Sequence, residues 1–147
     1  MTRNILAIIL ATLAFTLWGY IWYATVFDDV WQSLISRSET ELIEMAVARG
    51  RIQDVFTVVI SLVQVLGIYA ALKWVKARTF IHYIGLSLLL STLVVMPALG
   101  NATLFAGTPL GLLVLDYVHF VFGYAGIAFV FFLLKPPTKK APEKLWP

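Results

Sequence analysis

Four long apolar runs dominate this sequence, and they limit its possible folds more than any other feature. We place them at residues 4–27, 55–74, 80–97 and 110–134. Each run is close to the roughly 20 residues that a helix needs to cross the hydrocarbon core of a bilayer. The chain is 61% hydrophobic and 13% charged, a balance that is typical of membrane proteins. We therefore predict an all-α fold, a four-helix transmembrane bundle.

The four runs use most of the chain and leave little room for anything else. We expect a single integral membrane domain over residues 1–147, without a soluble catalytic domain. Cysteine is absent, which excludes disulfides, thiolate catalysis and cysteine metal sites. The first run is too long for a secretory signal peptide, and Trp22 and Tyr23 stand where small cleavage-site residues would be needed. We predict that it is an uncleaved helix, and nothing in the chain indicates nucleic acid binding.

The positions of the positive charges predict how the chain is oriented. Eight of the 11 Lys and Arg residues lie before the first run, at the end of the second run or between it and the third, or after the fourth. Three lie in the first loop, and the third loop carries no charge. Because cytoplasmic segments are rich in Lys and Arg, both termini should lie in the cytoplasm. The tail, residues 135–147, would then be cytoplasmic, where its lysines could touch anionic lipid.

The first loop should contain a short helix. Ser38 and Glu41 have the spacing of a capping box at a helix start, and Gly50 is a typical residue after a helix end. We predict a helix over residues 39–49 that lies on the outer membrane surface through its apolar side. A docking element for a partner is the alternative.

Aromatic side chains crowd the outer end of the first run. Trp and Tyr gather at membrane interfaces, which explains most of them. We single out Trp18, Trp22 and Trp31 as candidates for contact with a partner. Trp146 is a fourth candidate, because the proline- and lysine-rich tail around it should be disordered unless a partner or the membrane surface holds it.

Small and polar residues recur at helical spacing on each predicted helix. In lipid, small residues let helix backbones approach, and hydroxyl and amide groups bond between helices. We interpret the stripes as packing seams, with Gly19, Gly123 and Gly126 at the points of close approach. The stripes comprise Thr12, Thr16, Gly19 and Tyr23, then Asp54, Thr57, Ser61 and Gln64, then Ser87 and Ser91, and finally Asp116, His119, Gly123 and Gly126.

Asp116 is the only acidic residue inside any of the four runs, and His119 follows one turn later. Ionisable side chains at bilayer depth are costly and mark functional sites by default. Their spacing puts both on one helix face, about 9 and 13 Å from the outer helix end. Ser61 and Gln64 lie at a similar depth, and Tyr23 is a further possible donor. We expect one polar cluster in the outer half of the bundle.

Three interpretations of this cluster stay open. Asp116 and His119 can form a structural pair that other helices satisfy, or they can bind a ligand or relay protons. The third is a metal or haem site, but such a site would have few further ligands. His82 is the only other histidine, and it lies near the opposite end of its run, too far away to share one haem. We expect no metal, no cofactor and no catalytic residue.

The most specific motif ends the first run. Residues 19–31 read Gly-Tyr-Ile-Trp-Tyr-Ala-Thr-Val-Phe-Asp-Asp-Val-Trp. The spacing Gly-x-x-Trp-Tyr-x-x-x-Phe-x-x-x-Trp resembles the signature of a small bacterial four-helix membrane family of unknown function. The resemblance extends through the acidic first loop and the middle spans to the start of the last span. Ala24 and Thr25 replace the usual small-residue or proline turn. The resemblance implies the architecture and provides no activity to carry over.

These observations lead to three expectations about function, of which a membrane enzyme has the least support. We favour a non-enzymatic, multi-pass protein of the bacterial inner membrane that serves as an accessory or assembly subunit of a larger membrane complex, or forms a homo-oligomer. The alternative is a small carrier or binding protein for a lipophilic or protonatable ligand, which would use Asp116 and His119. A cavity that reaches Asp116 from outside would favour the alternative.

Overall fold

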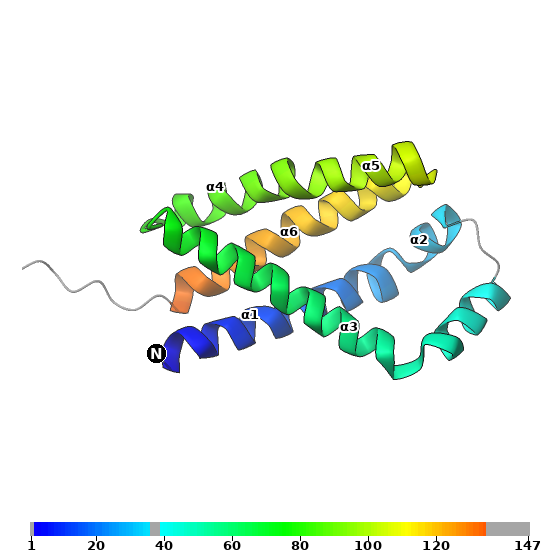
Figure 1. Cartoon of the computed structure of the whole chain (residues 1–147), viewed down its shortest axis with the longest axis horizontal. Coiled ribbons are helices and arrows are strands. Elements are labelled where there is room, and N and C mark those ends of the chain that lie inside the picture. The colour runs from blue at the N-terminus through cyan, green and yellow to red at the C-terminus, as the bar shows by residue number, and fades with distance from the viewer. Residues whose placement is uncertain (1, 36–38, 135–147) are drawn as a thin grey trace, which may run out of the picture.

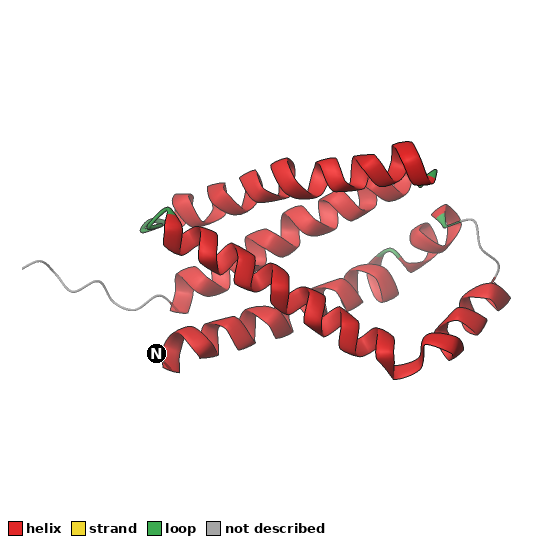
Figure 2. Cartoon of the chain, viewed as in Figure 1, coloured by secondary structure: helices red, strands yellow, loops and turns green. Residues whose placement is uncertain are grey.

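The computed structural model describes residues 2–35 and 39–134, and this part of the chain is helical with short connecting turns (Figure 1, Figure 2). Two of the segments are π-helical, with wider turns than an α-helix. In chain order the elements are α1 (Thr2–Ile21), π-helix η1 (Trp22–Val26), α2 (Asp28–Leu34), α3 (Glu39–Trp74), α4 (Phe80–Leu90), π-helix η2 (Ser91–Val95), α5 (Met96–Ala106) and α6 (Leu110–Leu134).

Four helical stretches are long and apolar enough to cross a membrane. They are Arg3–Val26, Gly50–Trp74, Phe80–Ala106 and Leu110–Leu134. Large apolar side chains are exposed along all of them, as expected for helices that face lipid. The prediction of an all-helical chain with four transmembrane helices is confirmed to this extent, and the chain is a multi-pass membrane protein by length and composition.

Helix α6 is the centre of the bundle. It packs against α1 on one side and against α4, η2 and α5 on the other, while α3 crosses α1 (Figure 1). The start of α1, the turn between α3 and α4, and the end of α6 lie together at one end of the molecule (Figure 1). We call this the terminal end, and the opposite one the loop end.

The core follows from helical periodicity. Apolar residues spaced by three or four positions face the same side of a helix, so each helix buries one stripe. The stripe of α1 meets that of α6, and the part of α3 from Ser61 onward packs mainly on α1 and less on α6. The largest members are Phe15 from α1, Val65, Ile68 and Leu72 from α3, and Tyr124, Ile127 and Phe131 from α6.

Helix α3 is broken at Gly50. The backbone there has φ 50° and ψ −147°, a conformation that glycine adopts far more easily than other residues. The break separates a helix that starts at Glu39 from the second transmembrane span, which begins near residue 50 instead of 55. The placement of the first helix on the membrane surface stays a prediction. Ser38 of the capping box, Trp146 and the tail, residues 135–147, lie outside the described residues.

The third span is longer than predicted. We placed its end at residue 97, where a proline normally ends a helix, but the chain remains helical to Ala106. Proline lacks an N–H, and its ring crowds the carbonyl four residues earlier. The π-helical turn η2 ends two residues before Pro97, and its wider turn accommodates the proline ring. Pro97 then occupies the first turn of α5, where no N–H is required. Gly107, with φ 70°, ends the helix in a left-handed conformation.

The orientation of this bundle can be tested with reporter fusions. We expect a reporter fused after Arg78 and one fused after Trp146 to report a cytoplasmic position. Most Lys and Arg residues lie in the segments that contain these two fusion points or precede α1, and cytoplasmic segments are rich in both residue types. A fusion after Gly107, in the uncharged third loop, serves as the control and should report the opposite side. A periplasmic signal after Arg78 or Trp146 would contradict the orientation.

Candidate functional site

A hydrogen bond between Tyr23 and Asp116 joins η1, the continuation of α1, to α6. The Tyr23 hydroxyl donates to Asp116 Oδ1 at 2.7 Å, and both side chains are half-buried. Tyr23 lies in the π-helical segment η1, in which the N–H of Phe27 bonds to the carbonyl of Trp22, five residues back, at 2.9 Å. Single π-helical turns redirect side chains and occur often at functional sites. The widened turn therefore sets the direction in which Tyr23 projects.

His119 is buried one turn further along α6, within a set of aromatic rings. Its side chain is 6% exposed. The Trp18 ring is parallel to it, with centroids 6.3 Å apart and planes at 4°, and the Tyr23 ring centroid is 4.9 Å away. The remaining rings around His119 belong to Phe15, Trp22 and Phe120. We call His119 and these five rings the histidine cage.

Three polar atoms of the histidine cage have no hydrogen-bond partner among the described residues. They are the two ring nitrogens of His119 and Nε1 of Trp22. By contrast, Trp18 Nε1 donates to the backbone carbonyl of His119 at 3.1 Å. A buried polar atom without a partner costs about 1–3 kcal/mol, and folded proteins keep few of them. Three in one place make the cage unusual within this bundle.

The structure shows no direct bond between Asp116 and His119, the pair that one of the three interpretations assumed. Asp116 bonds to Tyr23, and neither nitrogen of His119 bonds to Asp116. The physical reason is the helical geometry, since residues three positions apart point in directions about 60° apart. The Asp116 side chain bonds to the Tyr23 hydroxyl, whereas the His119 ring lies among the rings of α1 and η1 without a hydrogen bond to them.

Ser61 and Gln64 of α3 are not part of this site. Ser61 is buried and Gln64 Oε1 is buried without a partner, but the described residues show no hydrogen bond from either side chain to Asp116 or His119. Helix α3 covers α1 and makes few contacts with α6, and its outer part diverges from the bundle (Figure 1). The predicted five-residue cluster therefore reduces to Tyr23, Asp116 and His119.

The family to which the chain belongs was found by comparison with known proteins. Residues 6–132 match the model of a family described as a protein of unknown function, DUF1761. The chain belongs to the DUF1761 family. No curated protein and no solved structure matches the chain.

Membership in DUF1761 agrees with the resemblance to a family of unknown function that the sequence suggested. The matched region includes all three residues of the site and the motif over residues 19–31. That this motif is a signature of DUF1761, and that the family is bacterial, stay predictions. The family name assigns no activity, so function has to be argued from the site and the bundle.

The three glycines that we expected at close helix approaches have different surroundings in this DUF1761 chain. A Cβ at Gly123 would overlap the Phe15 ring, with ring atom Cδ2 at 2.8 Å, so α1 and α6 approach closely there. A Cβ at Gly19 would lie 3.6 Å from His119 Nε2, an ordinary contact. Gly126 is exposed, with no atom within 4 Å of such a Cβ, because the buried stripe of α6 continues through Ile127 instead. Gly126 is thus not a packing residue within the chain.

The tryptophans predicted to contact a partner lie largely inside the fold. Trp22 is 6% exposed and Trp18 is half-buried, since both share the helix face of Phe15 that meets α6. Trp31 of α2 is half-buried, and its ring lies edge-on to Tyr23 with centroids 6.3 Å apart. Their spacing along the sequence already placed Phe15, Trp18 and Trp22 on one face, which was the signal for the histidine cage.

Chemically, the site places a carboxylate, a phenol and an imidazole beside one another in aromatic surroundings. An imidazole can donate one hydrogen bond and accept another, and aromatic ring faces attract cations. The described residues contain no group of three or more His, Asp or Glu side chains that could hold a metal ion. The arrangement is suited to binding a small protonatable group, or to joining α1 and α6 rigidly.

Proposed function

We propose that this DUF1761 chain is a non-enzymatic subunit of the bacterial inner membrane, with both termini in the cytoplasm. It would assemble through the outer part of α3 with a helix of another membrane protein or with a second copy of itself. This proposal rests on the exposure of residues 51–60 of α3, which precede the part of the helix that packs against α1.

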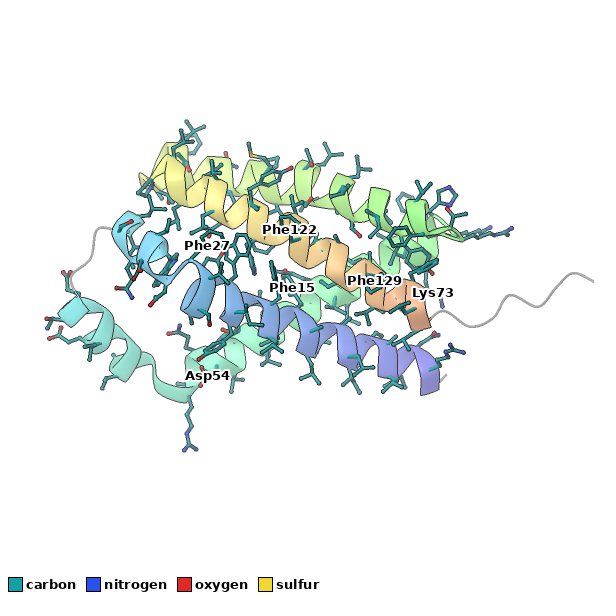
Figure 3. All side chains as sticks on the ribbon, turned by 180° about the vertical axis from the view of Figure 1, so that it is seen from behind. Phe15, Phe27, Asp54, Lys73, Phe122 and Phe129 are labelled. Carbon is teal, nitrogen blue, oxygen red and sulfur yellow. The ribbon has the colours of Figure 1, made fainter. Side chains whose placement is uncertain are left out.

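Every residue from 51 to 60 of α3 is exposed, although the whole segment belongs to a transmembrane span. The apolar members suit lipid, but Asp54 and Thr57 share one helix face there. Figure 3 shows Asp54 on α3 at the edge of the molecule. The same face continues into Ser61, which is buried in the bundle. The seam that packs against α1 thus extends outward without a neighbour from the described chain.

Polar residues on a membrane helix favour a protein neighbour over lipid. An exposed carboxylate in a span is costly, and interhelical contacts of polar side chains stabilise helix pairs. Thr57 Oγ1 bonds only to the carbonyl of Gln53 in its own helix. A partner helix laid along Asp54 and Thr57 would satisfy both side chains and cover the apolar residues beside them.

The double variant Asp54→Ala/Thr57→Val tests this proposal. We expect wild-type protein extracted in mild detergent to give the mass of a complex in native mass spectrometry. The variant should dissociate about tenfold more readily, since polar interhelical contacts contribute about 0.6–2 kcal/mol each. The mass of the complex tells a second copy from another subunit.

Thr25→Val/Asp29→Ala is the matched control. Both positions are exposed and lie at the same end of the molecule, in η1 and α2. The control should assemble as wild type does. A wild-type protein that remains a partner-free monomer under gentle extraction would refute the subunit proposal.

A second candidate function rests on the histidine cage. The three unpartnered polar atoms of His119 and Trp22 are suited to a protonatable or lipophilic ligand, with Asp116 and Tyr23 beside them. In this case the chain is a small carrier or binding protein. A small molecule that stays bound to the monomer in the same mass spectra would favour this function over the first.

A further inference from the structure

A cavity of about 360 Å³ lies at the terminal end of the bundle, away from the histidine cage. Residues from α1, α3, α4 and α6 and from the turn between α3 and α4 line it. Tyr69, Tyr83 and Phe131 form aromatic walls, and Lys73, Lys76 and Arg78 contribute positive charge. A pocket with apolar walls and several cations is suited to an anion that carries apolar groups.

The turn between α3 and α4 brings these cations to one place. The N–H of Lys76 bonds to the carbonyl of Lys73 at 3.1 Å, and the N–H of Ala77 bonds to that of Leu72 at 3.0 Å. Lys76 has φ 53°, a left-handed conformation that is uncommon for any residue except glycine and unfavourable by about 1 kcal/mol or more. Backbone strain of this kind occurs often at ligand sites.

The charge balance of this region favours an anion. From residue 55 to residue 115 the sequence contains no Asp or Glu. Helices α4 and α5 and the part of α3 after residue 54 therefore contribute no negative side chain. Lys73 Nζ lies 5.4 Å from the centre of the Tyr69 ring, which keeps the ammonium group at the cavity. Figure 3 shows Lys73 at the end of the bundle where α6 ends.

The depth of the cavity identifies the type of anion. Trp74 ends one span and Phe80 begins the next, so the cavity opens where the hydrocarbon core meets the headgroups. Phospholipid phosphates lie at this depth, and basic pockets between membrane helices bind anionic headgroups. The apolar walls formed by Tyr69 and Phe131 match the carbon atoms below a lipid phosphate, which inorganic phosphate lacks.

We propose that this cavity binds the headgroup of an anionic phospholipid, with Lys73 and Lys76 at its phosphate. The site depends on the membrane location of the chain and is independent of the assembly through α3. It belongs to a different end of the bundle and uses different residues.

The test measures thermal stabilisation of the full chain in detergent during titration with dioleoyl phosphatidylglycerol, dioleoyl phosphatidylcholine or inorganic phosphate. Phosphatidylglycerol should raise the melting temperature at lower concentration than phosphatidylcholine, and inorganic phosphate should not. Each lysine near an anionic headgroup contributes about fivefold in affinity, so Lys73→Gln/Lys76→Gln should weaken phosphatidylglycerol binding about 25-fold.

Arg49→Gln/Arg51→Gln removes the same charge on either side of the break at Gly50, away from this cavity, and is the matched control. It should bind phosphatidylglycerol with wild-type affinity. Equal effects of the two double variants would overturn the proposal, because binding would then follow overall charge. Equal stabilisation by phosphatidylcholine and phosphatidylglycerol would also overturn it, and stabilisation by inorganic phosphate alone would assign the cavity to a free anion instead of a lipid.

Discussion

Replacing Gly123 with leucine is expected to lower the stability of the bundle more than any other single change considered for this chain. A Cβ at Gly123 already overlaps the Phe15 ring and comes within 3.2 Å of Trp18. Phe15 has little freedom to move, because it packs between His119 and Tyr124. Overpacking a core typically costs about 1–3 kcal/mol and sometimes more. We expect a clear drop in melting temperature in mild detergent.

Gly126→Leu is the matched control for this experiment. It makes the same change in the same helix, but at an exposed position with open space around it. It should leave the melting temperature of the monomer unchanged or slightly higher, since leucine favours a helix by about 1 kcal/mol over glycine. Adding Phe15→Ala to Gly123→Leu should restore part of the loss. If Gly123→Leu melts like Gly126→Leu, the close approach of α1 and α6 is wrong.

Breaking the bond between Tyr23 and Asp116 is expected to have the next largest effect. Asp116→Leu leaves the Tyr23 hydroxyl without its acceptor, which should cost about 1–3 kcal/mol. Asp116→Asn keeps an oxygen at the same place and should cost less. In Tyr23→Phe/Asp116→Leu both partners are removed, so the double variant should be more stable than the sum of the single losses predicts. Thermal unfolding in mild detergent measures all of these variants.

A second tyrosine provides the control for this cycle. The hydroxyls of Tyr117 and Thr92 are 2.9 Å apart, in an exposed hydrogen bond between α6 and η2. Tyr117→Phe should therefore change the stability little, whereas Tyr23→Phe should lower it. Additive losses in the cycle would show that the Tyr23–Asp116 bond does not stabilise the fold. If Asp116 holds a ligand, Asp116→Asn should lose the bound molecule in native mass spectrometry while keeping its melting temperature.

The transmembrane helices could be predicted from the sequence because the bilayer leaves few alternatives. In lipid every backbone polar group must be bonded internally, so an apolar run of sufficient length forms a helix whatever its neighbours are. The stripe through Phe15, Trp18 and Trp22 was not among our predictions, although the helical repeat places these side chains on one face. Gly123 stood out as a small residue on such a face.

Helix ends were harder to predict because a local signal can be overridden. A proline such as Pro97 normally ends or kinks a helix, yet the third span continues to Ala106. The wider π-helical turn before Pro97 makes room for the proline ring, so the helix continues although Pro97 has no N–H to donate. Packing of this span along α6 stabilises it on both sides of the proline. No periodicity in the sequence shows such a compensation.

Which side chains meet between helices depended on the tertiary structure. The sequence by itself determined that Asp116 and His119 share a region of α6, but the rotation and crossing of the helices decided that Asp116 bonds to Tyr23 and that His119 enters the histidine cage. The helix crossings also decided that α3 packs mainly on α1, so that Ser61 and Gln64 form no hydrogen bond to Asp116 or His119. The physical reason is that the helical repeat sets directions within one helix. The directions between helices follow from packing contacts, such as Phe15 on Gly123, that are far apart in the chain.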